Sequence, residues 1–148
     1  MSKILAISSG GGHWEQLTII SESFGPHDVI FANTIPGLAE KSAITGAHII
    51  RDCNRDRPVA IILSFIDVLR LVMREKPDII ITTGAAPGLL ALVVGKMSGK
   101  RTIWIDSVAN SEKLSMSGRL AGALADLHVT QWEHLAGKGR TRYLGSVL

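Results

Sequence analysis

The sequence predicts an α/β fold with a Rossmann-like, doubly wound and mainly parallel sheet. Short runs of β-branched and aliphatic residues lack a polar alternation, which is typical of parallel strands that helices cover on both faces. Helical patterns separate these runs, and turns of glycine and other small residues follow two of them, at 9–13 and 83–87. This alternation indicates one Rossmann-like domain over residues 1–148.

Strands are expected wherever the chain is rich in Ile, Val and Thr over four to six residues. In chain order they are 3–8, 28–33, 47–50, 78–83, 101–106 and 126–131, of which 47–50 and 126–131 are the weaker. The last segment, RYLGSVL (142–148), resembles a short strand and leaves no room for another domain.

Helical patterns fill the intervals at 13–24, 58–76, 87–99 and 115–125. In the 58–76 helix, Asp56 is expected near the N-cap, Pro58 in the first turn and Pro77 just beyond the end. Its apolar residues recur at helical spacing: Val59, Ile62, Leu63, Ile66, Leu69 and Met73. Such a stripe serves either the protein core or a membrane surface, and the core is the commoner use.

Composition excludes several classes of protein. The net charge of +3 is scattered along the chain and accompanies no nucleic-acid motif, so nucleic-acid binding is not expected. The single cysteine, Cys53, forms no intramolecular disulfide and fits a reducing compartment. No stretch reaches the roughly 20 apolar residues that span a bilayer, so we expect a soluble or peripheral protein.

The first glycine turn, SSGGGHWEQL (8–17), matches neither the P-loop pattern nor GxGxxG, because Glu15 occupies the position of the third glycine. Two interpretations remain: a tight turn, or a turn whose backbone approaches a ligand closely, since three glycines cost much conformational entropy. His13 is a candidate general base there. Glu15 favours the positive end of the helix dipole, and free amides at the helix start bind phosphate.

Two further loops follow strand ends on the same edge. TTGAAPG (82–88) begins another helix, and the long polar loop at 105–120 begins with Asp106 and Ser107. Asp106 either orients a hydroxyl or acts as a second carboxylate, whereas a serine in this loop caps the next helix. Trp132, after the sixth strand, either stacks on a sugar or covers the core. No metal site is expected, because the histidines are not at ligand spacing.

Taken in order, SSGGGHWEQL, TTGAAPG, DSVAN, LSMSGRL and ADLHVTQWEHL resemble the Alg14 family and its bacterial PssD-like relatives. The likeness covers nearly the whole chain, down to LGSV near its end. LSMSGRL followed by ADLHVTQW is its most specific part. The GGGH turn is also similar, more distantly, to the acceptor domain of MurG-type enzymes.

The resemblance implies the N-terminal half of a GT-B glycosyltransferase. The chain would bind the acceptor and recruit its partner to the membrane, and it would be active only in a complex. The partner would resemble Alg13 or PssE and hold most of the UDP-sugar. The sugar would pass to a lipid-diphosphate-linked saccharide without a metal or cofactor. The location implied is cytoplasmic, peripheral at the inner face of the plasma membrane.

The same resemblance suggests the site residues. His13 matches the turn histidine and is the candidate base or acceptor ligand, while Glu15 beside it either binds the acceptor or supports the turn. Asp106 and Ser107 stand where eukaryotic relatives commonly have Glu-Ser. The candidate acceptor- and phosphate-binding residues are Gly11, Gly12, Gly84, Ala85, Asp106, Ser107 and Trp132.

The chain also departs from the family pattern. Eukaryotic members carry an N-terminal transmembrane anchor, whereas this chain begins at its first strand, so attachment would come from an apolar surface such as the 58–76 helix or from the partner. Asn110 stands where relatives often have Arg, which weakens the expectation of a phosphate contact there. Two rival interpretations are a stand-alone nucleotide-binding module and a non-catalytic scaffold.

Overall fold

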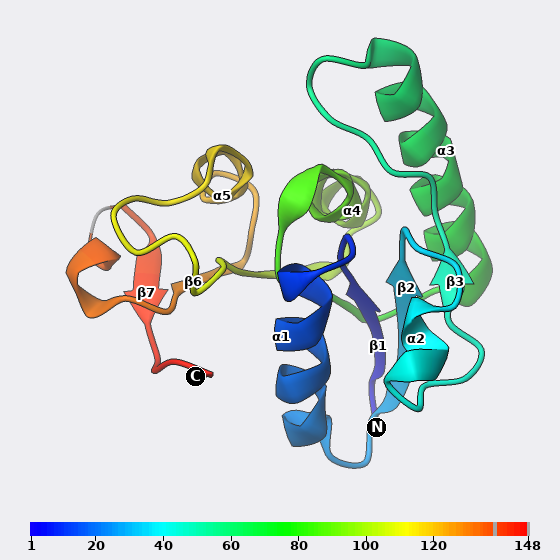
Figure 1. Ribbon diagram of the computed structural model, residues 1–148, viewed down its shortest axis with the longest axis horizontal. Coiled ribbons are helices and arrows are strands. Elements are labelled where there is room, and N and C mark those ends of the chain that lie inside the picture. Colours follow the sequence, from blue (N-terminus) through cyan, green and yellow to red (C-terminus); the bar gives the residue numbers. More distant parts are fainter. Residues whose placement is uncertain (138, 148) are drawn as a thin grey trace.

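The computed structural model describes residues 1–137 and 139–147, and its seven strands form one sheet (Figure 1). The strands are β1 (Lys3–Ile7), β2 (Asp28–Asn33), β3 (His48–Ile49), β4 (Ile79–Thr82), β5 (Arg101–Ile105), β6 (Leu127–Thr130) and β7 (Thr141–Tyr143). Every neighbouring pair is parallel, in the order β3-β2-β1-β4-β5-β6-β7. This is the doubly wound order, so the predicted fold class is confirmed.

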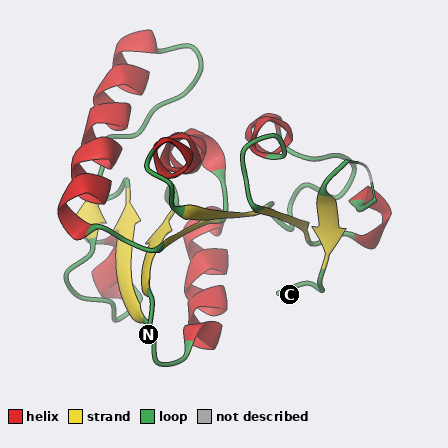
Figure 2. Ribbon diagram, turned by 180° about the vertical axis from the view of Figure 1, so that it is seen from behind, coloured by secondary structure: helices red, strands yellow, loops and turns green. Residues whose placement is uncertain are grey.

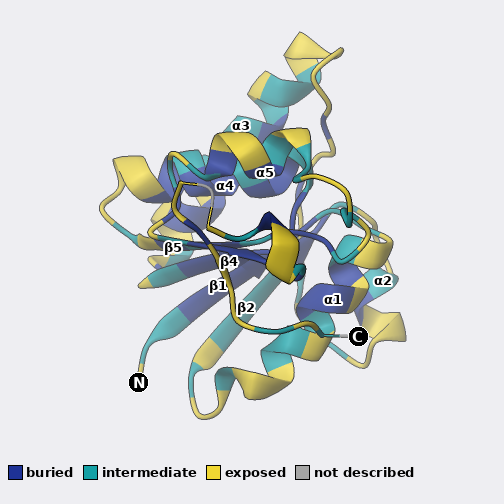
Figure 3. Ribbon diagram, turned by 90° about the vertical axis from the view of Figure 1, so that its left-hand side faces the viewer, coloured by how far each residue is buried: buried dark blue, intermediate teal, exposed yellow. Residues whose placement is uncertain are grey.

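Helices cover both faces of the sheet. They are α1 (Gly12–Ser21), α2 (Leu38–Lys41), α3 (Pro58–Glu75), α4 (Ala85–Met97) and α5 (Met116–Ala121), with 3-10 turns at η1 (Glu22–Phe24) and η2 (Glu133–Leu135). Figures 2 and 3 show α3, α4 and α5 on one face, with α1 and α2 on the other. The carboxyl ends of β1 and β4 therefore lie between helices of opposite layers.

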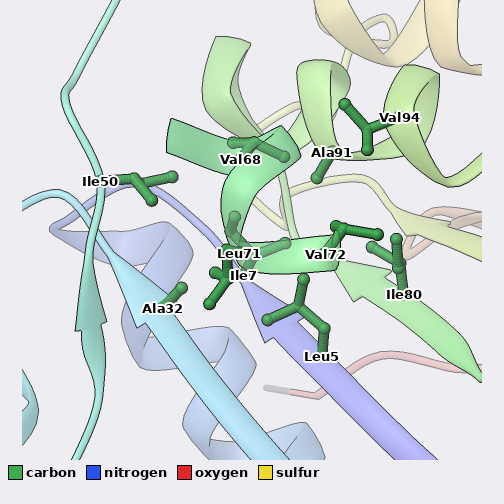
Figure 4. Packing of buried hydrophobic residues seen from close by; sticks show 10 residues of the cluster. All are labelled: Leu5, Ile7, Ala32, Ile50, Val68, Leu71, Val72, Ile80, Ala91 and Val94. Atoms are coloured by element: carbon green, nitrogen blue, oxygen red, sulfur yellow. The ribbon is translucent and has the colours of Figure 1, made fainter. Parts of the chain in front are cut away.

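The central strand β1 explains why the sequence shows no polar alternation. Its residues Leu5 and Ile7 pack toward α3 and α4, in the cluster drawn in Figure 4. Ile4 and Ala6 point the other way and pack with Trp14 of α1. Because both faces of β1 are buried, both sets of side chains must be apolar.

α3 differs most from its prediction. The residues that it buries are Ser64, Val68, Leu71 and Val72. Three members of the expected stripe lie on the surface, with Val59 at 69%, Ile62 at 58% and Met73 at 60% exposure. The helix is apolar on more than one side, and its first half extends beyond the sheet (Figure 1). Leu69 packs against the core, but Val59, Ile62 and Met73 do not, so the expectation that the stripe as a whole faces the core was wrong.

Smaller differences concern helix starts and the chain end. The N-cap of α3 is Arg57, next to Asp56, and no side chain caps the helix there. α4 begins at Ala85, two residues before the expected Pro87, and α2 lies between the second and third strands, where the sequence indicated a helix without fixing its bounds. The expected strand at 142–148 appears as β7 at Thr141–Tyr143, and residue 148 lies outside the described residues. None of the helices in the described ranges is long and apolar enough to cross a membrane.

Candidate functional site

A pocket of about 240 Å³ opens at the carboxyl edge of the sheet, near the switch point between β1 and β4. In doubly wound sheets this edge is where ligands bind. The walls come from the starts of α1, α4 and α5 and from the loop after β5. The lining residues are His13, Ala85, Ser107, Ala109, Asn110, Ser115, Met116 and Ser117.

The imidazole of His13 is held in one orientation by the turn after β4. Its Nδ1 lies 3.1 Å from the carbonyl oxygen of Thr83, and the Thr83 hydroxyl donates to the His13 carbonyl oxygen at 2.6 Å. A carbonyl only accepts, so this bond assigns the proton to Nδ1 and leaves the Nε2 lone pair available. His13 can therefore take a proton at Nε2 from a group in the pocket.

The turn at Gly84 and Ala85 is built around this histidine. Gly84 has φ 136°, and a Cβ there would lie 2.8 Å from Cε1 and Nδ1 of His13. Ala85 adopts φ 68°, a conformation that costs energy in a residue with a side chain. Because Gly84 lacks a side chain, the ring of His13 can lie directly against the backbone of the second loop.

The glycines before His13 are less crowded, except for the first. A Cβ on Gly10 would lie 2.1 Å from Cδ1 of Ile35. Gly11 needs its freedom for φ 68°, whereas Gly12 has neither a positive φ nor, within the described residues, an atom within 4 Å of a built Cβ. Both are exposed, so this backbone is accessible to a ligand.

The helices that begin at these two turns present free backbone amides. Neither α1 nor α4 has a side-chain cap among the residues that the structure describes. The first amides of a helix have no intrahelical acceptor and carry the positive end of the helix dipole. Two such helix starts next to one pocket favour an anion such as a diphosphate.

Asp106 lies beneath the pocket, with 1% exposure. Its Oδ1 accepts from the indole of Trp104 at 3.1 Å and from the hydroxyl of Ser115 at 2.8 Å. Its Oδ2 accepts from the side chain of Asn110 and the amide of Ser115, both at 3.2 Å. These four bonds hold the loop after β5 against the first turn of α5. Asn110 also lines the pocket, and its side-chain amide group is already bound to Asp106.

Ser107 belongs to a second buried network, centred on Gln16. The Gln16 amide group donates to the hydroxyl of Ser107 at 3.1 Å. Its Oε1 accepts from the amide of Val108 at 3.1 Å and from the side chain of Gln131 at 2.6 Å. This network ties α1 to the pocket loop. Sequence reasoning missed the role of Gln16, because a glutamine on a helix carries no signal that it is buried.

The two remaining candidates lie outside the pocket wall. The indole of Trp132 donates to the carbonyl of Val108, in the loop after β5, at 2.7 Å. Glu15 is exposed in the first turn of α1. The structure therefore gathers His13, Ala85 and Ser107 around the pocket, with Gly11, Gly12 and Gly84 in its supporting turns.

The site combines one oriented imidazole with small polar groups and helix-start amides. Within residues 1–137 and 139–147, no three His, Cys, Asp or Glu side chains form a group that could hold a metal ion. Arrangements of this kind suit proton transfer from a bound hydroxyl next to an anionic group.

Solved structures share this fold at low sequence identity. MurG from Acinetobacter baumannii aligns with 97% of this chain and 45% of its own, with a TM-score of 0.81 and 11% identity. UDP-N-acetylglucosamine 2-epimerase from Rickettsia bellii aligns with 99% of this chain and 45% of its own, at a TM-score of 0.74 and 17% identity. These similarities show the Rossmann-like fold, and this chain spans less than half the length of each of these two proteins.

Sequence relatives point to a single family. The UDP-N-acetylglucosamine transferase subunit ALG14 of Eremothecium gossypii is 33% identical over 86 residues, which cover 53% of this chain and 38% of that protein. The human protein of the same name is 27% identical over 184 residues, covering 98% of this chain and 82% of its own length. The family model for "Oligosaccharide biosynthesis protein Alg14 like" matches residues 37–147, so the chain belongs to the Alg14 family.

Proposed function

We propose that this chain is the acceptor-binding half of a two-chain glycosyltransferase. The complex would transfer a sugar from a UDP-sugar to a lipid-diphosphate-linked saccharide. The observation that carries the proposal is the imidazole of His13, which the Thr83 carbonyl holds through Nδ1 and which lines a pocket beside the uncapped starts of α1 and α4. Sequence relatives named as UDP-N-acetylglucosamine transferase subunits support the reaction class.

In the proposed reaction, His13 is the general base. An acceptor hydroxyl in the 240 Å³ pocket gives its proton to Nε2 as its oxygen attacks the anomeric carbon of the donor sugar. The bond between that carbon and the UDP oxygen breaks, and UDP leaves with the electron pair. The bond from Nδ1 to the Thr83 carbonyl stabilises the imidazolium that forms.

The acceptor diphosphate is assigned to the helix starts. The amides of Gly11, Gly12 and Ala85 would bind its oxygens, since the Gly84 amide already donates to Thr82 Oγ1, and the open space around Gly12 admits a bulky group. Ser107 and the loop that Asp106 holds would contact the acceptor sugar. Glu15, exposed beside His13, is available for a second hydroxyl.

The donor site is assigned to a partner subunit. The part of the MurG chain that aligns with this chain is 45% of its length, which supports a separate donor-binding unit in the complex. That partner, an Alg13- or PssE-like protein, would contribute most of the UDP-sugar contacts. The pocket faces the edge of the sheet where such a unit would complete the cleft.

Attachment to the inner face of the plasma membrane is assigned to α3. Val59, Ile62 and Met73 expose their side chains along one stripe of this helix, and Arg70 and Arg74 are exposed on it as well. An amphipathic helix with basic residues binds an anionic lipid surface without spanning it.

The test is reconstitution. The tagged chain is purified from its host with any co-purifying partner, and transfer from UDP-sugars to a lipid-diphosphate-linked sugar is measured. We expect His13→Ala to lower kcat by about 10²- to 10⁴-fold with the complex intact. His48→Ala, at the edge strand β3, serves as the matched control and leaves kcat unchanged.

Two outcomes would contradict the proposal. Unchanged turnover in His13→Ala would favour a non-catalytic scaffold that recruits a complete enzyme. A chain that purifies alone and binds a nucleotide by itself would favour a stand-alone nucleotide-binding module.

A further inference from the structure

We propose that Gln16 is a positioning residue, which fixes the hydroxyl of Ser107 as a hydrogen-bond donor to the ligand in the His13 pocket. The inference rests on the proposed function and deepens it, because it states which kind of ligand atom lies beside Ser107. Gln16 lies on α1 and Ser107 in the loop after β5, and both are buried, with 5% and 7% exposure. Ser107 also lines the pocket.

The orientation of the Gln16 side chain is fixed by groups that have only one hydrogen-bonding role. The backbone amide of Val108 can only donate, so the Gln16 atom that lies 3.1 Å from it is the oxygen Oε1. The side chain of Gln131 agrees with this orientation, because its Nε2 donates to the same Oε1 at 2.6 Å. The amide nitrogen of Gln16 is therefore the atom that lies next to Ser107.

The orientation of Gln131 is fixed in the same way. Its Nε2 also donates to the backbone carbonyl of Asp106 at 3.0 Å, and a carbonyl can only accept. Its Oε1 accepts from the backbone amide of Val147 at 3.1 Å, and that amide can only donate. A flip of either glutamine would place donors against donors or acceptors against acceptors in a buried network, which costs free energy.

The hydroxyl oxygen of Ser107 has both of its acceptor positions occupied as a result. It accepts from Nε2 of Gln16 at 3.1 Å and from the backbone amide of Ala109 at 3.2 Å. A hydroxyl has two acceptor lone pairs and one hydrogen, so only the hydrogen is left. No group within residues 1–137 and 139–147 accepts this hydrogen, and Ser107 lines the pocket. The hydrogen is therefore assigned to a ligand in the pocket.

A donor of fixed role selects the chemistry of the ligand. The ligand atom beside Ser107 must be an oxygen that accepts, which is either a hydroxyl oxygen of the acceptor sugar or an oxygen of its diphosphate. A group that can only donate, such as an ammonium, is disfavoured. His13 has the complementary role, because its Nδ1 donates to the Thr83 carbonyl and its Nε2 is left to accept. One fixed donor and one fixed acceptor in the same pocket suit a polyhydroxylated ligand such as a sugar.

The first test is Ser107→Ala in the reconstituted complex, with the lipid-diphosphate-linked monosaccharide that the wild-type complex elongates. Loss of one neutral hydrogen bond to the substrate should raise KM for this acceptor about 10-fold, with kcat little changed. Ser23→Ala is the matched control. The Ser23 hydroxyl donates to the Ile20 carbonyl on the exposed surface and lies outside the pocket, so KM should stay at the wild-type value.

A series of deoxy acceptors identifies the ligand oxygen. Each sugar hydroxyl is replaced in turn by hydrogen, and each analogue is tested as a competitor of the parent acceptor. A position whose loss weakens inhibition of the wild type about 10-fold, and of Ser107→Ala hardly at all, is the partner of Ser107. If every position affects both proteins equally while Ser107→Ala still raises KM, the partner is a diphosphate oxygen.

Two substitutions of Gln16 separate positioning from a purely structural role. In Gln16→Glu, one carboxylate oxygen still accepts from Val108 and Gln131, but the other also accepts, so the Ser107 hydroxyl donates to it and is lost to the ligand. In Gln16→Met, the bonds to Val108 and Gln131 are lost, but nothing competes for the Ser107 hydrogen. We expect KM for the acceptor to be about 10-fold higher in Gln16→Glu than in Gln16→Met, although Gln16→Met should unfold at the lower urea concentration.

Three results would overturn the inference in distinguishable ways. An unchanged KM in Ser107→Ala would mean that this hydroxyl contacts no ligand. If the Gln16 variant with the lower stability also has the higher KM, Gln16 only supports the fold. If the wild-type complex elongates no lipid-diphosphate-linked sugar, the proposed function fails, and the inference fails with it.

Discussion

The two small-residue turns at the pocket look alike in sequence but differ in the structure. In the turn after β4, Gly84 and Gly88 are fixed by close neighbours: a Cβ on Gly84 would meet His13 at 2.8 Å, and one on Gly88 would meet Oγ1 of Thr82 at 2.2 Å. In the turn after β1, Gly11 and Gly12 have no atom of the described chain within 4 Å of a built Cβ. The turn after β4 is packed at both glycines, whereas the turn after β1 is packed at Gly10 and open at Gly11 and Gly12.

This difference separates two uses of glycine. At Gly84 the missing side chain lets the protein pack against itself and fixes the His13 ring. At Gly12 it leaves space that the protein does not fill. A glycine without a packing or φ requirement is costly in entropy, so the space left open at Gly12 points to a ligand.

Gly84→Ala is expected to have the largest effect. The new alanine must adopt φ 136°, and its Cβ must displace the imidazole of His13. We therefore expect a loss of about 3 kcal/mol in the free energy of unfolding. Transfer activity should fall with it, because His13 loses its orientation. Urea unfolding followed by circular dichroism measures the first effect, and the reconstituted assay measures the second.

Gly99→Ala is the control for backbone strain alone. Gly99 has φ 70° but lies in open space within the described part of the chain, so only the conformational cost of about 1–2 kcal/mol applies. An equal loss in both variants would show that contact with His13 contributes nothing at Gly84.

Asp106→Asn is expected to have a smaller effect, and it tests the hydrogen bonds that hold the loop after β5. Each carboxylate oxygen accepts two hydrogen bonds, so an amide group at either position faces donors. We expect a loss of about 2 kcal/mol in stability and a disordered 106–115 loop. Hydrogen exchange at the Ser115 amide measures the loop directly. Protection as in the wild type would show that the loop is held by other contacts.

Much of the fold followed from local patterns, and the site did so only in part. The strands were predictable because β1, β2, β4 and β5 are buried on both faces and therefore read as continuous apolar runs. The helices were placed within a few residues. The buried side of α3 was not predictable, because its apolar residues surround the helix and only tertiary contacts select Val68 and Leu71 over Ile62.

The sequence identified candidate site residues only where a glycine-rich turn follows a strand. Glycine runs located His13 and Gly84 at the same edge, since parallel strands share their carboxyl end. The burial of Asp106 and its four hydrogen bonds could not be predicted from the sequence, because they depend on how the fold brings Trp104, Asn110 and Ser115 around this carboxylate. The link between Gln16 and Gln131 spans 115 residues and leaves no local pattern.

Acid should lower the stability of the fold through the buried His128. His128 lies under α5, where its Nε2 donates to the Gly118 carbonyl at 2.7 Å and its Nδ1 accepts from the Thr141 hydroxyl at 3.0 Å. Burial is the main cause that lowers the pKa of His128 below its usual 6.5. The unfolded chain therefore takes up a proton first, and stability falls as the pH drops below 6.5.

The measurement is the melting temperature between neutral and mildly acidic pH. His128→Gln keeps a neutral side chain at every pH in this range, so its melting temperature should depend less on pH than that of the wild type. If the melting temperatures of the two proteins depend equally on pH, groups other than His128 cause the acid sensitivity.

Gly12→Ala should have the smallest effect on folding and so tests the open side of the pocket. Position 12 is the first residue of α1, its φ is not positive, and a Cβ there meets nothing of the described chain within 4 Å. The substitution should therefore leave stability unchanged or raise it by up to about 1 kcal/mol. If the acceptor diphosphate lies against this backbone, the methyl group should raise KM for the acceptor about 10-fold with kcat nearly unchanged. A variant with wild-type KM and unchanged stability would mean that the space at Gly12 serves neither the fold nor the acceptor, and the two turns would then differ only in packing.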